Sequence, residues 1–264
     1  MFSLYTSLYN LKNGFIDWKG ALENFEDFAE EVCVATTSMS EPFGYDAKTL
    51  REYAVLHPRV KIIVTDFSFD DLAFDGKLKN AALSICKEPF CILLDGDERV
   101  DVRHRVNWET IARTIEKDNK WDAAFIPVVD LFNTDREYKS IGQKWYLHKN
   151  LPNLNRGIVN FAKKENNKID IKRSDTCELI YDDNSLVRSW CMNVTQPDLE
   201  YIKFIGCCVW HLGWLDKEKR LKSNNFWQKV WDNRAGFEVK NIIHSKEKLD
   251  KIEYWPHGLK LWYE

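Results

Sequence analysis

The sequence lacks the features that would place the chain in a membrane or on a polyanion. No apolar run approaches the roughly 20 residues of a membrane-spanning helix. The first residues have neither the basic region nor the small-residue cleavage site of a signal peptide, so we expect no secretory leader. The 38 Lys and Arg nearly balance the 41 Asp and Glu, and a net charge of -3 gives no general attraction to nucleic acid or anionic lipid.

Cysteine pairs of the kind that bind zinc are also missing. The seven cysteines include no C-x-x-C pair, and their spacing does not suit a zinc site. Most lie inside apolar runs such as residues 90–94, so we expect reduced cysteines that pack as small hydrophobic side chains. This pattern is typical of a cytoplasmic protein, which is the location we predict.

The first 130 residues show a regular alternation of strand and helix signals. Short apolar runs predict strands at residues 2–9, 32–37, 60–65, 90–94 and 123–129. Apolar residues at helical spacing predict a helix between each pair of strands, the first two capped by Asp17 and Asp46. Strands joined by single helices predict an α/β fold, with a mostly parallel, Rossmann-like sheet flanked by helices.

Residues 131–264 are less regular. Residues 163–172 are typical of a solvated loop, residues 201–210 form a strong apolar run, and Asp216 is expected to begin a basic amphipathic helix. Because no repeat or low-complexity linker separates the two parts, we expect one continuous domain.

The sharpest local signal is the segment Asp95, Gly96, Asp97 at the end of the apolar strand at 90–94. Side chains two residues apart on an extended chain point the same way, so both carboxylates are expected to face one site, with Gly96 giving a ligand access to the backbone. Ligands of open α/β sheets bind at the carboxyl ends of the strands. One or two carboxylates, completed by phosphates and water, suit Mg²⁺ or Mn²⁺. An acidic turn with no ligand is the alternative interpretation.

Five segments together resemble the GT-A glycosyltransferases, in particular those of the family-two type. They are residues 6–10 (TSLYN), 32–38 (VCVATTS), 75–82 (DGKLKNAA), 94–98 (LDGDE) and 211–214 (HLGW). The resemblance covers roughly the first 130 residues and the late HLGW patch. One departure concerns the second strand, which ends in Thr36, Thr37 and Ser38 where the family usually has an acidic residue, so the donor base stays open.

The resemblance implies a metal-dependent enzyme that moves a sugar from a nucleoside-diphosphate sugar to an acceptor hydroxyl on a glycan, a lipid-linked or another molecule. Residues 1–130 would be the nucleotide-sugar-binding core, and residues 131–264 the acceptor side. The resemblance places Mn²⁺ or Mg²⁺ on Asp97, with Asp95 on the ribose or the metal and His211 completing the metal shell. A packed, hydrogen-bonded histidine is the alternative for His211. The expected donor contacts are Thr6, Tyr9, Thr37, Ser38, Asp66, Lys77, Asn80, Asp95 and Gly96.

The general base is not identified by the sequence. An inverting transferase needs an Asp or Glu near the acceptor hydroxyl, and relatives often carry a His-Glu pair after a Gly-x-Val. Here residues 157–161 (GIVNF) contain no acid, which leaves Asp130, Asp175 and Glu178 as candidates.

Tryptophan and positive charge are concentrated near the C-terminus. Residues 203–264 hold 12 Lys and Arg, 8 Asp and Glu, and six of the 11 tryptophans. Such a segment suits stacking on sugars, contact with nucleic acid, peripheral membrane binding, or cover for the back of the sheet. Trp227 and Trp231, four residues apart, favour the last interpretation.

Other classes of protein fit the sequence less well. Dehalogenase-type phosphatases carry their D-x-D on the first strand with a hydroxyl residue after it, whereas this one follows the fourth strand and has Arg99 at that position. A non-catalytic glycan- or nucleic-acid-binding protein remains an alternative, although it would not need Asp95 and Asp97.

Overall fold

A computed structural model describes residues 1–40, 42–69, 71, 73–132, 134–165, 168–183, 185–190, 207–214 and 250–251. Its helices are η1 (Leu11–Asn13), α1 (Trp18–Phe28), α2 (Tyr45–Leu56), α3 (Phe74–Ser84), η2 (Val102–His104) and α4 (Arg105–Lys117). The strands of its main sheet are β1 (Phe2–Ser7), β2 (Glu31–Thr37), β3 (Val60–Thr65), β4 (Phe90–Leu93), β5 (Glu98–Val100), β6 (Ala123–Phe132), β7 (Thr134–Lys149), β10 (Ser189–Trp190), β11 (Val209–Trp214) and β12 (Asp250–Lys251).

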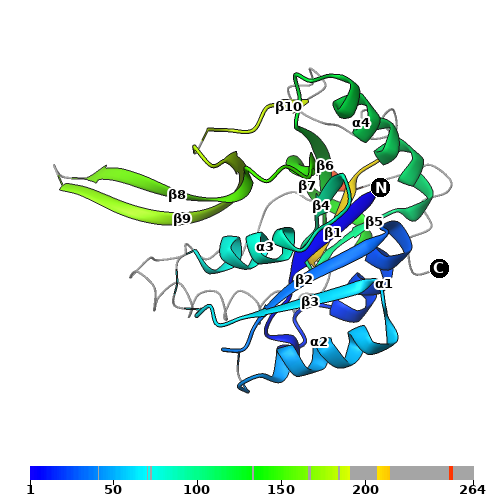
Figure 1. Ribbon diagram of the computed structural model, residues 1–264, viewed down its shortest axis with the longest axis vertical. Coiled ribbons are helices and arrows are strands. Elements are labelled where there is room, and N and C mark those ends of the chain that lie inside the picture. The colour runs from blue at the N-terminus through cyan, green and yellow to red at the C-terminus, as the bar shows by residue number, and fades with distance from the viewer. Residues whose placement is uncertain are drawn as a thin grey trace.

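The predicted α/β fold is confirmed, and its first half follows the expected alternation (Figure 1). The strand order is β3-β2-β1-β4-β7-β6-β11-β5, with β10 beside β6 and β12 beside β7. Strands β1 to β4 pair in parallel, whereas β7 lies between β4 and β6 and is antiparallel to both. Of β7, a strand-like pattern was predicted only for residues 144–147 (KWYL), because most of this 16-residue strand is polar.

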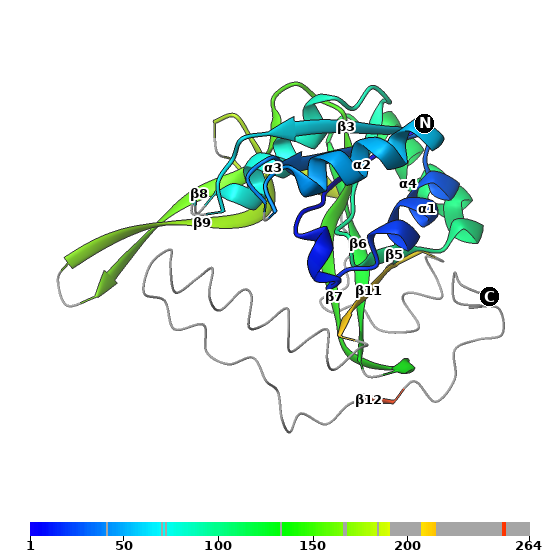
Figure 2. The same cartoon turned by 90° about the horizontal axis from the view of Figure 1, so that it is seen from below.

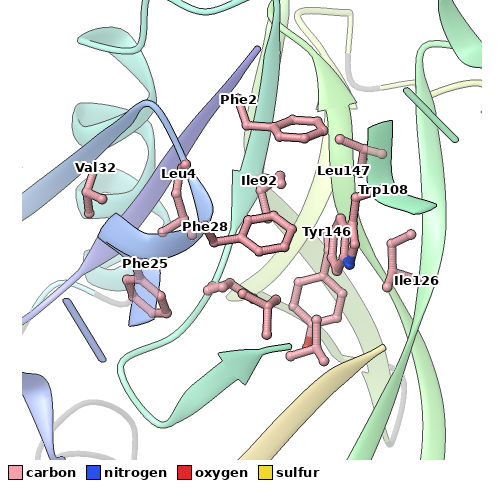
Figure 3. Close-up of a cluster of buried hydrophobic side chains, with 14 of the residues drawn as sticks. Phe2, Leu4, Phe25, Phe28, Val32, Ile92, Trp108, Ile126, Tyr146 and Leu147 are labelled. Carbon is pink, nitrogen blue, oxygen red and sulfur yellow. The ribbon is translucent and has the colours of Figure 1, made fainter. Parts of the chain in front are cut away.

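Helices cover both faces of the parallel half. Helices α1, α2 and α4 pack on one face, while α3 packs on the other, where Leu78 meets Tyr5 and Cys91. Figure 3 shows Phe25 and Phe28 of α1 and Trp108 of α4 in one cluster with Leu4, Ile92 and Tyr146 of the sheet. The cysteines at 33, 86, 91, 207 and 208 are free thiols, as expected.

Strands β8 (Leu154–Glu165) and β9 (Lys168–Tyr181) form an antiparallel hairpin that extends away from the sheet (Figure 1, Figure 2). The prediction of a loop at residues 163–172 was therefore wrong. A ribbon that pairs only with itself is defined by hydrogen bonds between its strands, so no apolar run marks it in the sequence. The base of the hairpin is tied to α3, because Asn80 accepts from the Arg156 N–H at 2.6 Å and donates to the Arg156 carbonyl at 3.0 Å.

Two further expectations fall partly outside the described residues. The helix predicted from Asp216, with Trp227 and Trp231, lies there entirely, and so does the part of the apolar run before residue 207. Among the helices that the structure describes, we find none with the length and apolar character needed to cross a bilayer.

Candidate active site

The acidic turn formed by Asp95, Gly96 and Asp97, here called the DGD turn, connects β4 to β5. The Glu98 N–H donates to the Asp95 carbonyl at 2.9 Å, and the Asp95 N–H donates to the Glu98 carboxylate at 2.8 Å. A Cβ on Gly96 would lie 2.7 Å from Leu8 Cδ2 and 2.9 Å from Ile16 Cγ2, so a larger residue there would displace these side chains. The turn is thus held in one shape while both Asp side chains stay partly exposed.

His211 of β11 faces the DGD turn. Its Nδ1–H donates to Asp130 Oδ1 of β6 at 2.7 Å, and its Nε2 lies 3.3 Å from Asp97 Oδ2. Strand register explains the meeting, because β11 runs between β6 and β5 with His211 opposite both Asp130 and Glu98. The structure therefore brings together the two predicted metal ligands, Asp97 and His211, and one of the candidate bases, Asp130.

The charges of this group reinforce one another. Burial lowers the pKa of His211, but the facing Asp97 and the bond to Asp130 outweigh it and hold the pKa well above the usual value. Burial raises the pKa of Asp97, whereas the His211 ring lowers it, with a net result below the usual range. The free site therefore pairs an imidazolium with two carboxylates.

Lys79 lies on the other side of the turn and was not singled out from the sequence. Its ammonium is 2.7 Å from Asp75 Oδ2 and 2.9 Å from Asp95 Oδ1, and its side chain is only 4% exposed. Ser7 at the end of β1 donates to Asp75 at 2.9 Å, which fixes that carboxylate. Burial raises the pKa of Asp95, but the charges of Lys79, Lys144 and His211 together outweigh it and hold the pKa below its usual range. The signal that could have found Lys79 is its spacing of four residues from Asp75 on one helix.

Glu98, a buried residue at the start of β5, anchors the turn by accepting the Asp95 N–H. It is fully buried, and it receives the Tyr146 hydroxyl hydrogen bond and the Lys144 ammonium, the latter at 3.1 Å. Burial and the neighbouring charge of Asp95 raise the pKa of Glu98. Both Tyr146 and Lys144 come from β7, within the short strand-like piece at residues 144–147 that the sequence indicated.

Lys77 and Asn80 are placed elsewhere than beside the turn. The Lys77 ammonium pairs with Asp71 and lies 5.8 Å from the centre of the Phe67 ring. Asn80 is engaged with the backbone of Arg156. Lys77 lies two residues before Lys79 on α3, and two residues along a helix turn the side chain by about 200°, so Lys77 points away from the DGD turn.

The other expected donor contacts lie around the carboxyl ends of β1, β2 and β3. The Tyr9 ring packs edge-on against Phe74 at 5.1 Å, and the Thr37 hydroxyl donates to the Phe67 carbonyl at 2.7 Å. Thr6 is fully buried, whereas Ser38 is partly exposed and Asp66 exposed.

Asp46 fixes the segment that follows β1. It is fully buried, and its two carboxylate oxygens accept the N–H groups of Asn10 at 2.6 Å and Leu11 at 3.1 Å. Asn10 is left-handed, with φ of 57°. Asp46 was expected to cap α2, but Gly44 occupies the cap and Asp46 sits in the first turn. Its carboxylate holds the neighbouring loop instead.

The three candidate bases lie on two different strands, Asp130 on β6 and Asp175 and Glu178 on β9. Asp130 is bound to His211. Asp175 and Glu178 belong to β9, where Asp175 is paired with Ile158 of β8.

Two of the C-terminal tryptophans lie on β11 beside His211. Trp210 is buried, and Trp214 ends β11.

The donor set fits a hard divalent cation with an incomplete protein shell. In the described ranges, no three His, Cys, Asp or Glu side chains form a ready metal cluster. Asp97 and His211 offer one carboxylate oxygen and one imidazole nitrogen 3.3 Å apart. Mg²⁺ and Mn²⁺ sites of this kind are completed by substrate phosphates and water, and an imidazole ligand suits Mn²⁺ better than Mg²⁺.

Comparison with known protein families gave no match, and no curated protein matched the sequence. Solved structures gave partial likenesses. S. aureus TarS, residues 1–349, has a TM-score of 0.38 and 15% identity over 56% of this chain and 47% of TarS; it has also been solved with UDP and with UDP-GlcNAc. The mannosyltransferase PcManGT from Pyrobaculum calidifontis, in complex with GDP-Man and Mn²⁺, has a TM-score of 0.34 and 16% identity over 50% of this chain and 35% of its own. HddC from Yersinia pseudotuberculosis has a TM-score of 0.31 and 12% identity over 56% of this chain and 72% of HddC.

Proposed function

We propose that this chain is a metal-dependent glycosyltransferase that uses a nucleoside-diphosphate sugar as donor. The observation that carries the proposal is the convergence on one turn of two carboxylates, Asp95 and Asp97, with Lys79 on one side and His211 on the other. Opposite charges arranged at the carboxyl edge of an α/β sheet suit a substrate that brings a diphosphate and a cation together.

In this proposal, Asp97 and His211 hold Mn²⁺ or Mg²⁺, and Asp130 orients the imidazole by accepting its Nδ1 proton. Bound there, the ion would neutralise negative charge on the diphosphate leaving group. Lys79 keeps Asp95 ionised and pointed at one place, where it would accept hydrogen bonds from the donor ribose.

Transfer forms a bond between the acceptor oxygen and the anomeric carbon and breaks the bond from that carbon to the diphosphate. The hydroxyl proton must pass to a base. Asp130 is already bound to His211, which favours a positioning role for it. We keep Asp175 and Glu178 of β9 as candidates for the base.

The test is sugar transfer and donor hydrolysis with a panel of UDP- and GDP-sugars, with Mn²⁺, with Mg²⁺ and with a chelator. We expect metal-dependent release of a nucleoside diphosphate from at least one donor. Asp97→Ala should reduce turnover at least 100-fold, whereas Asp27→Ala on the exposed side of α1 should not change it. The proposal is abandoned if no donor binds or if Asp97→Ala retains full activity.

A further inference from the structure

Lys144 is an exposed cation beside the DGD turn. Strand β7 runs antiparallel to β4 with Leu147 opposite Ile92, so Lys144 reaches the end of β4 where Asp95 begins the turn. Its ammonium is 3.1 Å from Glu98 Oε1 and its side chain is 52% exposed. The ammonium also lies 5.6 Å from the centre of the Tyr146 ring. One side of Lys144 is thus anchored to the protein while the other faces solvent.

The anchor of Lys144 is rigid. Glu98 is fully buried, and its other carboxylate oxygen accepts the backbone N–H of Asp95 at 2.8 Å. The Tyr146 hydroxyl donates to the same oxygen that contacts Lys144. A lysine held by a fixed carboxylate loses less side-chain entropy when it binds an anion than a free surface lysine does.

The other cations at this turn are already occupied. Lys79 is 4% exposed and lies between Asp75 and Asp95, and His211 lies between Asp97 and Asp130. Of the cations that contact carboxylates of residues 95–98 in the described part of the chain, Lys144 is the one with most of its side chain toward solvent. An ammonium has three N–H donors, so contact with Glu98 leaves capacity for a ligand.

We propose that Lys144 binds the diphosphate of the donor and stabilises the charge that the leaving nucleoside diphosphate gains as its bond to the anomeric carbon breaks. This inference rests on the proposed function, because it concerns the same substrate. A purely structural lysine that only satisfies Glu98 is the competing explanation. The two differ in one respect: a structural lysine can be replaced by a neutral hydrogen-bond donor, whereas a diphosphate ligand needs the charge.

The experiment uses Lys144→Gln, which keeps an N–H donor for Glu98, with Lys144→Arg and Lys144→Met as companions. Lys117→Gln, on the exposed end of α4, is the matched control. Binding of UDP, GDP, uridine, guanosine and inorganic pyrophosphate is measured with Mn²⁺. We expect Lys144→Gln to weaken the preferred diphosphate and pyrophosphate about 10-fold or more, to change nucleoside binding less than about 2-fold, and to lower kcat, with partial recovery in Lys144→Arg.

Circular dichroism and thermal unfolding establish that each variant is folded. Should Lys144→Met fail to fold, Lys144→Gln and Lys144→Arg still decide the question. The inference is overturned if Lys144→Gln binds diphosphate like the unaltered protein, or if nucleoside and diphosphate weaken by the same factor. Absence of any nucleotide binding to the unaltered protein would overturn the proposed function as well, so the two failures are told apart.

Discussion

Each charged side chain at the DGD turn has a partner of opposite sign, and this pairing decides its charge state. A buried carboxylate without a partner would take up a proton. Lys79, with the charges of Lys144 and His211, prevents this at Asp95, and His211 is the main group that prevents it at Asp97. The site therefore offers two ionised carboxylates at neutral pH in spite of their partial burial.

The surroundings of Gly213 show how closely the side chains of Asp97 and His211 are packed. A Cβ at this position would lie 2.6 Å from Asp97 Oδ2 and 2.9 Å from His211 Nε2, so Gly213→Ala must displace both proposed metal ligands. We expect Mn²⁺ affinity to fall about 10-fold or more, with a loss in the free energy of unfolding below about 2 kcal/mol. Titration calorimetry with Mn²⁺ and chemical unfolding measure the two quantities.

Gly20→Ala is the matched control, because it displaces the Asp17 carboxylate at the start of α1 and neither of the proposed metal ligands. If Gly213→Ala lost stability but kept its affinity for Mn²⁺, Asp97 and His211 would not be the metal ligands.

His148 gives a prediction for the dependence of stability on pH. It is fully buried, its Nδ1–H donates to the Lys149 carbonyl at 2.8 Å, and its Nε2 accepts from the Tyr5 hydroxyl, which in turn accepts from Arg156. Burial, and then the charge of Arg156, lower its pKa from 6.5 to about 3. At pH values between about 3 and 6.5, His148 is protonated in the unfolded chain and neutral in the folded chain. The free energy of unfolding therefore falls as the pH falls below 6.5.

From this one group we expect a loss of about 2 kcal/mol in the free energy of unfolding between about pH 7 and pH 5. His148→Gln, whose amide oxygen can still accept from Tyr5, should remove that part of the loss. Urea unfolding at both pH values, with His104→Gln as control, measures it. Equal pH dependence in His148→Gln and the unaltered protein would show that His148 is protonated in the fold.

At the scale of elements, the loop after β1 depends on the first turn of α2. The two N–H groups that follow β1 point at Asp46, and the left-handed Asn10 turns the chain toward η1. Asparagine is among the few residues other than glycine that adopt this conformation readily. A side chain from one crossover thus sets the backbone of another at the edge where the donor is expected to bind.

Asp46→Ala leaves the two N–H groups without this acceptor. We expect the free energy of unfolding to fall by about 2 kcal/mol, because buried donors lose their partner. Asp27→Ala, at an exposed position of α1, should stay within about 0.5 kcal/mol of the unaltered protein. Chemical unfolding of the two variants side by side decides the point; similar values for both would mean that water replaces the carboxylate.

At the scale of the whole molecule, the site joins distant parts of the chain. Helix α3 supplies Lys79, β6 supplies Asp130, β7 supplies Lys144, and β11 supplies His211, all around the turn after β4. The strands of residues 131–264 that contribute belong to the same sheet as those of residues 1–130. A ligand that contacts all of these elements should therefore stabilise the sheet as a unit.

We expect Mn²⁺ and a nucleoside diphosphate together to raise the free energy of unfolding more than the sum of their separate effects. At a ligand concentration of 100 times its dissociation constant, the gain is about 2.7 kcal/mol. Thermal unfolding with each ligand alone and with both measures it. Asp97→Ala should abolish the joint effect; a joint effect that survived in Asp97→Ala would place the metal elsewhere.

The sequence alone determined the alternation of the first half, since buried parallel strands must be apolar throughout and their helices must carry an apolar stripe. For the same reason it located the DGD turn at the end of a central strand, and it picked His211 from the HLGW segment. These are local properties, written in neighbouring residues.

Only the tertiary structure decided which side chains meet. The register of β11 against β6 sets His211 opposite Asp130, and the antiparallel run of β7 beside β4 brings Lys144 to Glu98. The rotation of α3 turns Lys79 to the site while Lys77 pairs with Asp71. Polar strands such as β7 have almost no hydrophobic pattern, and contacts between distant segments leave no local sequence signal. For these two reasons, neither the full strand nor the contacts could be predicted from the sequence alone.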